Sequence, residues 1–375
     1  MIRETRMNSW PDRRLLDLFG IEMPIIQAPM AGPGTPELAM AVSDAGGLGS
    51  LPCAQLSVEQ TRAALERVGP CASRPLNLNF FCHTPPAVDA VRSLRWRARL
   101  APYYVELGLD PEAALPVAGR RPFDDDFCAV VEDYRPTVVS FHFGLPRREL
   151  LERVKTVGAK VVSSATTVAE ARWLEEHGCD AIIAMGYEAG GHRGNFLVED
   201  MSRQVGTFAL VPQVVDAVTV PVIAAGGIAD ARGIVAALAL GAAAVQIGTA
   251  YLFCPEANVP PVYLEALNRA GDDDTMITNV FTGRPARGIV NRVMREQGPL
   301  SAVAPAFPLA AAALTPLKAK SEAAGRGDFT NLWSGQAAAL ARRSVPAGQL
   351  TRLLAREALE KLSRNPASAT ASHST

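Results

Sequence analysis

Charge of one sign, aromatic side chains and long apolar runs are all scarce in this sequence. The 375 residues carry 37 Lys and Arg against 38 Asp and Glu, a formal net charge of −1, so nothing favours nucleic acid or an anionic membrane as a partner. Aromatic residues make up 6%, and no stretch approaches the roughly 20 apolar residues of a membrane-spanning helix. The opening residues 1–10 lack the apolar core of a signal peptide, which predicts a cytoplasmic protein.

Cysteine and histidine are few and scattered. None of the six cysteines forms a CxxC pair, and the five histidines show neither HxxxH nor HExxH spacing. Reduced, mostly buried thiols are therefore expected, and no protein metal site is predicted. A GxGxxG motif after an early strand is also missing, which argues against a two-domain dinucleotide-binding dehydrogenase.

Short apolar runs alternate with helical stretches along most of the chain. Runs this short and continuously apolar are typical of parallel strands buried on both faces. The eight candidate strands are residues 24–28, 47–51, 76–80, 137–141, 160–164, 181–184, 221–225 and 243–247. Eight strands with intervening helices predict an α/β fold of the (β/α)8, or TIM barrel, type. A doubly wound open sheet is the alternative, because counting strands does not show that the sheet closes.

Several helices carry clear start signals. Thr35 precedes a proline and a glutamate, which places a capping hydroxyl before a first-turn proline. Ser57 and Thr167 are each followed three residues later by Gln or Glu, as in a capping box. Asp230 opens a further helix that runs to about Leu240. These caps support the alternation of strands and helices.

The β/α period ends after the eighth strand. We expect residues 15–254 and 330–363 to form the barrel, with a C-terminal helix from about Gln336 to Ser363. Residues 255–329 are predicted to be a helical addition on the substrate side, and residues 100–134 are long enough to hold extra helices. The termini, 1–14 and 364–375, are expected to be flexible.

The most informative stretch is GYEAGGHRG, residues 186–194, which directly follows the sixth strand. A glycine pair and a titratable side chain at the carboxyl end of a strand are how a parallel α/β protein builds a ligand site. His192 is therefore the candidate catalytic residue. Taken alone, the motif favours a flexible turn at Gly190 and Gly191 and a solvated loop residue at His192, but the rest of the chain shifts the balance toward a ligand site.

Other strand ends supply further candidates. Strand one ends in QAPMAG, where the small residues around Ala28, Pro29 and Met30 leave the backbone free to hydrogen-bond a flat ring system. Asn77 and Asn79 point the same way by the two-residue period of a strand. Their amides either bind a polar ligand or form a side-chain hydrogen-bond network that closes the barrel. His142, between two phenylalanines, either lines the pocket or is a hydrogen-bonded core residue.

Strands seven and eight both end in glycine. Gly226 and Gly227 precede the helix that starts near Asp230, and Gln246, Ile247, Gly248 and Thr249 end strand eight. Glycines at these two positions, with helix N-terminal amides behind them, are the usual phosphate site of a barrel. The alternative is a pair of tight turns with no ligand. A phosphorylated cofactor anchored there places its ring over strands one, three and six, and flavin mononucleotide (FMN) fits that geometry.

In combination, these motifs resemble the FMN-dependent nitronate monooxygenase family, formerly called 2-nitropropane dioxygenases. The resemblance covers roughly residues 24–252 and the piece FTNLWSGQ at 329–336. It rests on QAPMAG at 27, AGGLGSLP at 45, SFHFGLP at 140, EAGGHRG at 188, AAGGIAD at 224 and QIGTAYL at 246, in that order. It implies a TIM barrel with tightly held FMN that oxidises alkyl nitronates, such as propionate 3-nitronate, with O2 to a carbonyl compound and nitrite.

The resemblance also assigns roles to individual residues. His192 matches the catalytic histidine of the family. The expected FMN contacts are Ala28, Pro29, Met30, Asn79, Met185, Gly190, Gly191, Gly226, Gly227, Gln246, Ile247, Gly248 and Thr249. Met185 stands where the family usually has glutamine, and a thioether cannot make the hydrogen bonds of an amide. Arg193 either holds a substrate carboxylate or a phosphate oxygen or is a solvated loop residue, and His142 is a second candidate substrate contact.

The expected partners are a nitronate or nitroalkane and O2, with a homodimer as a further possibility and no metal. An NAD(P)H-dependent FMN reductase of the same superfamily, acting on an enoyl thioester or a quinone, is the nearest alternative. The HRG form of the motif and the SFHFGLP run favour the oxidase. A barrel dehydrogenase acting on a nucleotide is disfavoured because no cysteine lies next to the loop after strand six. A flavin-binding barrel without catalysis is the remaining alternative, and the intact His192 argues against it.

Overall fold

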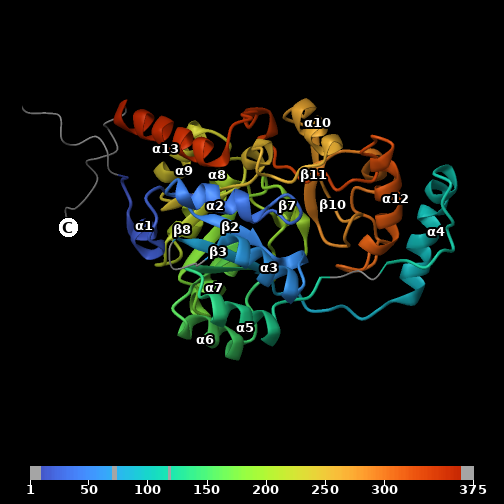
Figure 1. Ribbon diagram of the computed structural model, residues 1–375, viewed down its shortest axis with the longest axis horizontal. Coiled ribbons are helices and arrows are strands. Elements are labelled where there is room, and N and C mark those ends of the chain that lie inside the picture. Colours follow the sequence, from blue (N-terminus) through green and yellow to red (C-terminus); the bar gives the residue numbers. More distant parts are fainter. Residues whose placement is uncertain (1–9, 70–73, 117–119, 365–375) are drawn as a thin grey trace, which may run out of the picture.

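A computed structural model describes residues 10–69, 74–116 and 120–364, and its central feature is a closed barrel of eight parallel strands (Figure 1). The strands are β1 Ile25–Gln27, β2 Gly49–Pro52, β3 Leu76–Phe81, β4 Val138–His142, β5 Lys160–Ala165, β6 Ala181–Met185, β8 Val222–Ala225 and β9 Ala244–Ile247. Their order is β1-β9-β8-β6-β5-β4-β3-β2. A parallel bridge between Ile26 and Leu48 joins β1 to the chain entering β2, so the sheet closes. This confirms the (β/α)8 fold and all eight predicted strands.

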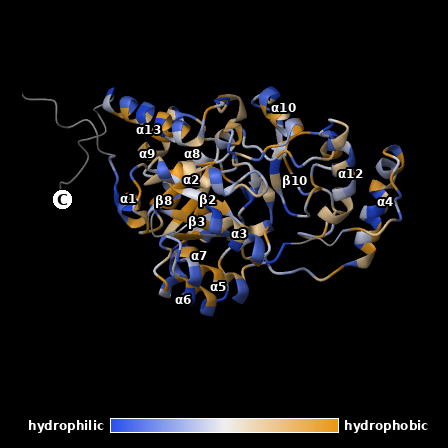
Figure 2. Ribbon diagram, viewed as in Figure 1, coloured by the Kyte–Doolittle hydropathy of each residue, from blue (hydrophilic) through white to orange (hydrophobic). Residues whose placement is uncertain are grey.

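Helices surround the barrel and cover the outward faces of its strands. They are α1 Arg14–Phe19, α2 Pro36–Asp44, α3 Val58–Val68, α5 Asp125–Tyr134, α6 Arg148–Thr156, α7 Val168–Glu176, α8 Thr207–Val215, α9 Ala231–Ala239 and α13 Ala347–Arg364. Apolar residues gather on the strands, and the outer faces of the helices are polar (Figure 2). The helices and strands pack closely: a Cβ added to Gly49 would lie 1.9 Å from the carbonyl oxygen of Ala39. Among the described residues, no helix is long and apolar enough to cross a membrane.

The predicted helix caps are present with one change. The Thr35 and Asp230 side chains accept hydrogen bonds from the first turns of α2 and α9, and Ser57 and Gln60 form a complete capping box. Thr167 caps α7, but Glu170 does not complete a box. Its carboxylate instead accepts from the amides of Thr166 and of Phe196 and Leu197. Glu170 therefore ties the chain that follows His192 to the barrel.

Both chain ends differ from the prediction where they are described. Residues 1–9 and 365–375 lie outside the described residues. Trp10 is buried in the main core, and helix α1 begins at Arg14. The C-terminal helix α13 begins at Ala347, not at Gln336. Pro346 directly precedes it, and a proline has no amide hydrogen to continue a helix from an earlier turn. In residues 336–346 the chain makes only a short 3₁₀ turn, Ala338–Leu340.

The addition after the barrel is not purely helical. It contains α10 Pro261–Arg269, α11 Arg292–Gln297 and α12 Ala311–Ala323, but also strands β10 Thr275–Thr278 and β11 Ala286–Ile289. β11 pairs antiparallel with both β10 and the two-residue strand β7, Gly191–His192. The prediction of helices alone was wrong because this sheet depends on pairing with β7, which no local pattern reveals.

A segment from the first half of the chain completes this second unit. Helix α4, Ala90–Glu106, lies against α12 and away from the barrel (Figure 1). Trp96 donates to the carbonyl of Ala310 at 3.3 Å, and Tyr104 donates to that of Ala313 at 2.7 Å. The two units share no simple boundary in sequence, so the predicted division at residues 255 and 329 leaves out α4.

Candidate active site

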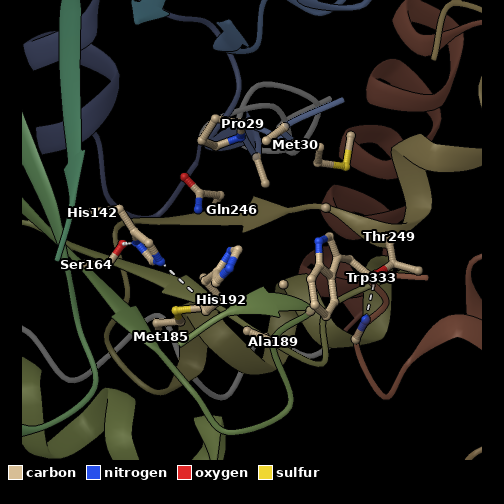
Figure 3. A pocket seen from close by; sticks show the side chains of 18 of the residues that line it. Pro29, Met30, His142, Ser164, Met185, Ala189, His192, Gln246, Thr249 and Trp333 are labelled. Carbon is tan, nitrogen blue, oxygen red and sulfur yellow. Dashed lines mark hydrogen bonds between the residues drawn. The ribbon is translucent and has the colours of Figure 1, made fainter. Parts of the chain in front are cut away.

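A cavity opens at the carboxyl ends of the barrel strands, between the barrel and the added unit. It comprises about 1240 Å³ of space free of protein atoms, which includes open solvent at its mouth. The predicted site residues that line it are Ala28, Pro29, Met30, Asn79, His142, Met185, Gly190, Gly191, His192, Gly226, Gly227, Gln246, Gly248 and Thr249. Two predicted residues, Arg193 and Ile247, do not line it. His192 and Trp333 stand on one side of the cavity, and Pro29 and Met30 on the other (Figure 3).

His192 is held on a strand, not on a flexible turn. It pairs with Ala286 across the β7–β11 ladder, and its Nε2 atom lies 2.9 Å from the hydroxyl of Thr282. The rings of Phe307 and Trp333 flank it, with centroids at 5.3 and 5.5 Å. This environment orients the imidazole and leaves its remaining edge toward the cavity.

Burial keeps the imidazole of His192 neutral. Desolvation is the main cause that lowers its pKa well below the usual 6.5, and the positive charges of nearby Arg120 and Arg284 lower the pKa further. A neutral imidazole both donates and accepts a hydrogen bond. Near neutral pH His192 is therefore able to accept a proton or to donate one hydrogen bond to a ligand.

Thr282 lies in the turn between β10 and β11 and was not predicted from the sequence. Its side chain is buried, with 3% of its surface exposed. It lies 90 residues from His192, in the segment that we expected to be helical. No motif marks it, because its role arises only when the β10–β11 turn packs over β7.

The side chain of His142 holds the backbone of His192 in place. Its Nε2 donates to the carbonyl of His192 at 3.1 Å, and its Nδ1 lies 3.1 Å from the hydroxyl of Ser164 (Figure 3). A carbonyl only accepts, so the proton sits on Nε2 and Nδ1 accepts from Ser164. Burial lowers the pKa of His142 to about 3. Both ring nitrogens are used within the protein, so His142 contributes a ring edge to the cavity, and its hydrogen bonds position His192.

Arg193 has a different place from the one expected. It is fully buried, and its guanidinium donates to the carbonyls of Gly186 at 2.6 Å and Met185 at 2.9 Å and to the side chain of Gln204. It is neither solvated nor directed into the cavity. Its pairing with the carboxyl end of β6 fixes the course of the loop that carries His192, so contact with a substrate carboxylate or a phosphate is not its role.

The ends of β8 and β9 form a rim of exposed backbone, which we call the backbone rim: Gly226, Gly227, Gly248 and Thr249. Gly226 and Gly227 have φ values of +113° and +72°, which favour glycine. Among the described residues, no acceptor is found for the amides of Gly227, Gly248 and Thr249. Ile247 is excluded from this rim because its side chain is in the core and its carbonyl accepts from Ala28.

Asn79 and Asn77 differ in their surroundings: Asn79 lines the cavity, and Asn77 belongs to the side-chain hydrogen bonds inside the barrel. Asn79 lines the cavity and donates to the hydroxyl of Ser140 at 2.9 Å. Asn77 lies one layer deeper and donates to the hydroxyl of Ser50 at 2.9 Å. Of the two, only Asn79 is placed to meet a ligand.

The C-terminal piece 329–336 closes the remaining side of the cavity. Trp333 and Gly335 line it, as does Tyr263 of α10, whose hydroxyl donates to the carbonyl of Trp333. Gly190 must be glycine here, because an added Cβ would lie 2.5 Å from the amide nitrogen of Gly335. The resemblance includes this piece, but neither Trp333 nor Tyr263 was predicted as a site residue. No group of three or more His, Cys, Asp or Glu side chains in the described parts of the chain is arranged to hold a metal ion.

The chain is similar to known proteins over most of its length. A model of the nitronate monooxygenase family matches residues 12–357. A nitronate monooxygenase of Pseudomonas aeruginosa is 42% identical over 346 residues, which cover 92% of this chain and 98% of the relative. One of Paraburkholderia phytofirmans is 42% identical over 347 residues, covering 92% and 94%.

A solved structure extends the comparison to three dimensions. A nitroalkane oxidase from Streptomyces ansochromogenes superimposes with a TM-score of 0.84 at 38% identity, covering 94% of this chain and 99% of that one. The likeness thus includes the added unit as well as the barrel. The family match and these relatives span nearly the whole length, and this chain belongs to the nitronate monooxygenase family.

Proposed function

We propose that this chain is an FMN-dependent nitronate monooxygenase, which oxidises alkyl nitronates with O2 to a carbonyl compound and nitrite. The observation that carries the proposal is His192, neutral and fixed by Thr282, facing the cavity opposite Pro29 and Met30. Membership of the family supports the reaction. The shape and the donors of the cavity support the cofactor.

The cavity fits a flavin phosphate held by backbone amides. None of the described residues that line it is a lysine or an arginine, so peptide groups and neutral side-chain donors are what can bind an anion there. The backbone rim offers amides without acceptors. Oriented backbone amides bind phosphate without a cationic side chain. The first-turn amides of α9 do not add to this site, because they donate to the side chain of Asp230.

Other lining residues suit the ring of the cofactor. Ala28, Pro29 and Met30 present small and apolar surface, and Asn79 and Gln246 add amide groups at the edge of the cavity. Met185 lines the same cavity from the end of β6. Its thioether is a weak acceptor and no donor, so we expect the contact that the family glutamine makes to be replaced here by packing alone.

Bound FMN would supply the redox chemistry, taking electrons from the nitronate and passing them to O2. The protein's residues bind and orient the substrate. The imidazole of His192 donates a hydrogen bond to one nitronate oxygen, or accepts the proton from the α-carbon of a neutral nitroalkane. The imidazole of His192 is surrounded by the rings of Phe81, Phe307 and Trp333. These rings exclude water from the imidazole, which strengthens its hydrogen bond to the substrate.

Two measurements on purified protein test the proposal. The absorbance spectrum should show flavin bands, and the released cofactor should be FMN by chromatography and mass. Nitrite release from a panel of alkyl nitronates should depend on O2. A flavin that NADH or NADPH bleaches rapidly without O2, with no nitrite formed, would instead support the reductase.

The role of His192 is tested by replacement. His192→Asn should keep FMN bound and lose most turnover of neutral nitroalkanes, because an amide is not a base at neutral pH. His177→Asn is a matched control, since His177 lies on the surface beside Trp173 and away from the cavity. Undiminished turnover in His192→Asn would reject its role as the base.

A further inference from the structure

The side chain of Trp333 brings a hydrogen-bond donor to the cavity that the protein itself does not use. Trp333 lines the cavity beside His192, and its indole nitrogen points into the cavity, toward the side of Pro29 and Met30 (Figure 3). The indole N–H has no acceptor among the described residues, whereas that of Trp96 donates to a backbone carbonyl. An enclosed indole N–H usually has a partner, so a ligand in the cavity is the acceptor that remains.

The position of Trp333 is fixed by the same strand that fixes His192. Its backbone forms an antiparallel bridge with Gly288 of β11, and β11 also pairs with β7, which carries His192. The carbonyl of Trp333 accepts from the hydroxyl of Tyr263, and its ring stands edge-on to that of Phe281 at 5.3 Å. The ring centroids of Trp333 and His192 are 5.5 Å apart. Two side chains this close contact the same small ligand.

Removal of a proton from a neutral nitroalkane needs a second donor besides the base. The bond between the α-carbon and its hydrogen breaks, the proton goes to the imidazole of His192, and the electron pair spreads onto the two nitro oxygens. Thr282 occupies Nε2 of His192, so the one free ring nitrogen takes the proton and cannot also donate to those oxygens. A fixed donor aimed at the developing charge lowers the barrier to this step.

Trp333 is placed to be that donor. Four rings flank His192 in the described parts of the chain, and only the ring of Trp333 carries an N–H group. The other three belong to Phe81, Phe143 and Phe307. None of the described residues that line the cavity is a lysine or an arginine. Side-chain donors at the end of β9 lie beside the backbone rim, where the proposed function places the cofactor.

We propose that the indole N–H of Trp333 donates a hydrogen bond to a nitro oxygen and stabilises the charge that develops there as His192 removes the α-proton. Trp333 is then a catalytic residue of the proton-removal step. The proposal rests on the proposed function. It treats a nitroalkane and its nitronate differently, because a nitronate carries its charge before it binds. With a nitronate, Trp333 contributes to binding and not to the rate of the later redox step.

The test uses one compound in two protonation states, nitroethane and ethyl nitronate. Trp333→Phe keeps an aromatic ring beside His192 but removes the N–H group. We expect it to lower kcat for nitroethane by about 10- to 100-fold, the effect of losing one hydrogen bond to a charged group. For ethyl nitronate we expect kcat to change by less than about threefold and KM to rise. Trp173→Phe is the matched control and should change neither, because Trp173 stacks on His177 at the surface.

A second replacement separates the N–H group from the shape of the ring. Benzothienylalanine, in which sulfur takes the place of the indole N–H, is incorporated in place of Trp333. It should lose turnover of nitroethane to the same extent as Trp333→Phe. Full turnover with this analogue, or equal losses of kcat on both substrates, would overturn the proposal. Flavin absorbance checks that each variant is folded, and if Trp333→Phe does not fold, the analogue alone decides.

Binding of acetate distinguishes failure of this proposal from failure of the proposed function. Acetate has two oxygens that share one negative charge, as a nitronate does, and its effect on the flavin spectrum measures Kd without turnover. We expect Kd to rise about 10-fold in Trp333→Phe, and an unchanged Kd would overturn the donor role of Trp333. Absence of nitrite from both substrates with the wild-type enzyme would instead overturn the proposed function.

Discussion

The hydrogen bond between Thr282 and His192 provides the sharpest prediction about catalysis. Thr282→Val keeps the shape of the side chain but removes its hydroxyl, so Nε2 of His192 loses its partner at 2.9 Å. Thr282 is 3% exposed, which leaves little room for water to replace the hydroxyl. The variant tests whether the added unit orients the imidazole of His192 or only covers it.

The expected size of the effect follows from burial. A buried polar group left without a partner costs about 1–3 kcal/mol. The other contacts of the hydroxyl, to the backbone of Arg284, are at 3.4 Å, and we assign them little energy. If about 2 kcal/mol is lost in the transition state, kcat/KM falls by roughly 30-fold.

The assay is nitrite release from neutral nitroalkanes, for which we propose His192 as the base. Thr282→Val should lower kcat more than it raises KM, with FMN content unchanged, because the histidine stays in place but turns more freely. Thr282→Ser retains the hydroxyl and should restore most of the activity. The reasoning would be refuted by a Val variant with full activity, or by a Ser variant as impaired as the Val variant.

Three further predictions concern stability and the cavity. Gly190→Ala should abolish FMN binding, because the added Cβ meets the backbone of Gly335. Gly191 has φ +73° and open space around it, so Gly191→Ala should lower the free energy of unfolding by only about 1–2 kcal/mol. Flavin absorbance and urea unfolding distinguish the two variants. Arg193→Met should lower the free energy of unfolding by about 3 kcal/mol with equal effects on carboxylated and uncharged nitronates, and selective loss of the carboxylated one would contradict this. The free energy of unfolding should fall as pH falls from 6.5 toward 3, because His142 then binds a proton in the unfolded state but, with its pKa lowered to about 3, not in the folded state. In urea unfolding, His142→Asn should make this decline less steep, and an unchanged slope would show that other groups cause it.

Features that depend on residues close together in the chain were predictable from the sequence. The eight strands follow from short apolar runs, since burial on both faces requires apolar residues at every position. The caps at Thr35, Ser57 and Asp230 follow from the need of a helix N-terminus for a local acceptor. The glycines at 226 and 227 were found for the same reason, because a backbone with positive φ selects glycine wherever it occurs.

The direction in which a loop side chain points was not predictable from the sequence. Arg193 and His192 are adjacent, and in a strand adjacent side chains point to opposite faces. The sequence shows both residues but not that this loop becomes strand β7. Only the pairing with β11 sends His192 into the cavity and Arg193 into the protein.

The sequence by itself therefore determined the barrel, the position of the glycines and the identity of the candidate histidine, because each is written in residues close together in the chain. Tertiary structure alone decided how that histidine is held and what surrounds it. Thr282 and Arg284 arrive from a turn some 90 residues away, and Arg120 from the chain between α4 and α5. Contacts of this kind form when distant segments pack, and no local pattern encodes them.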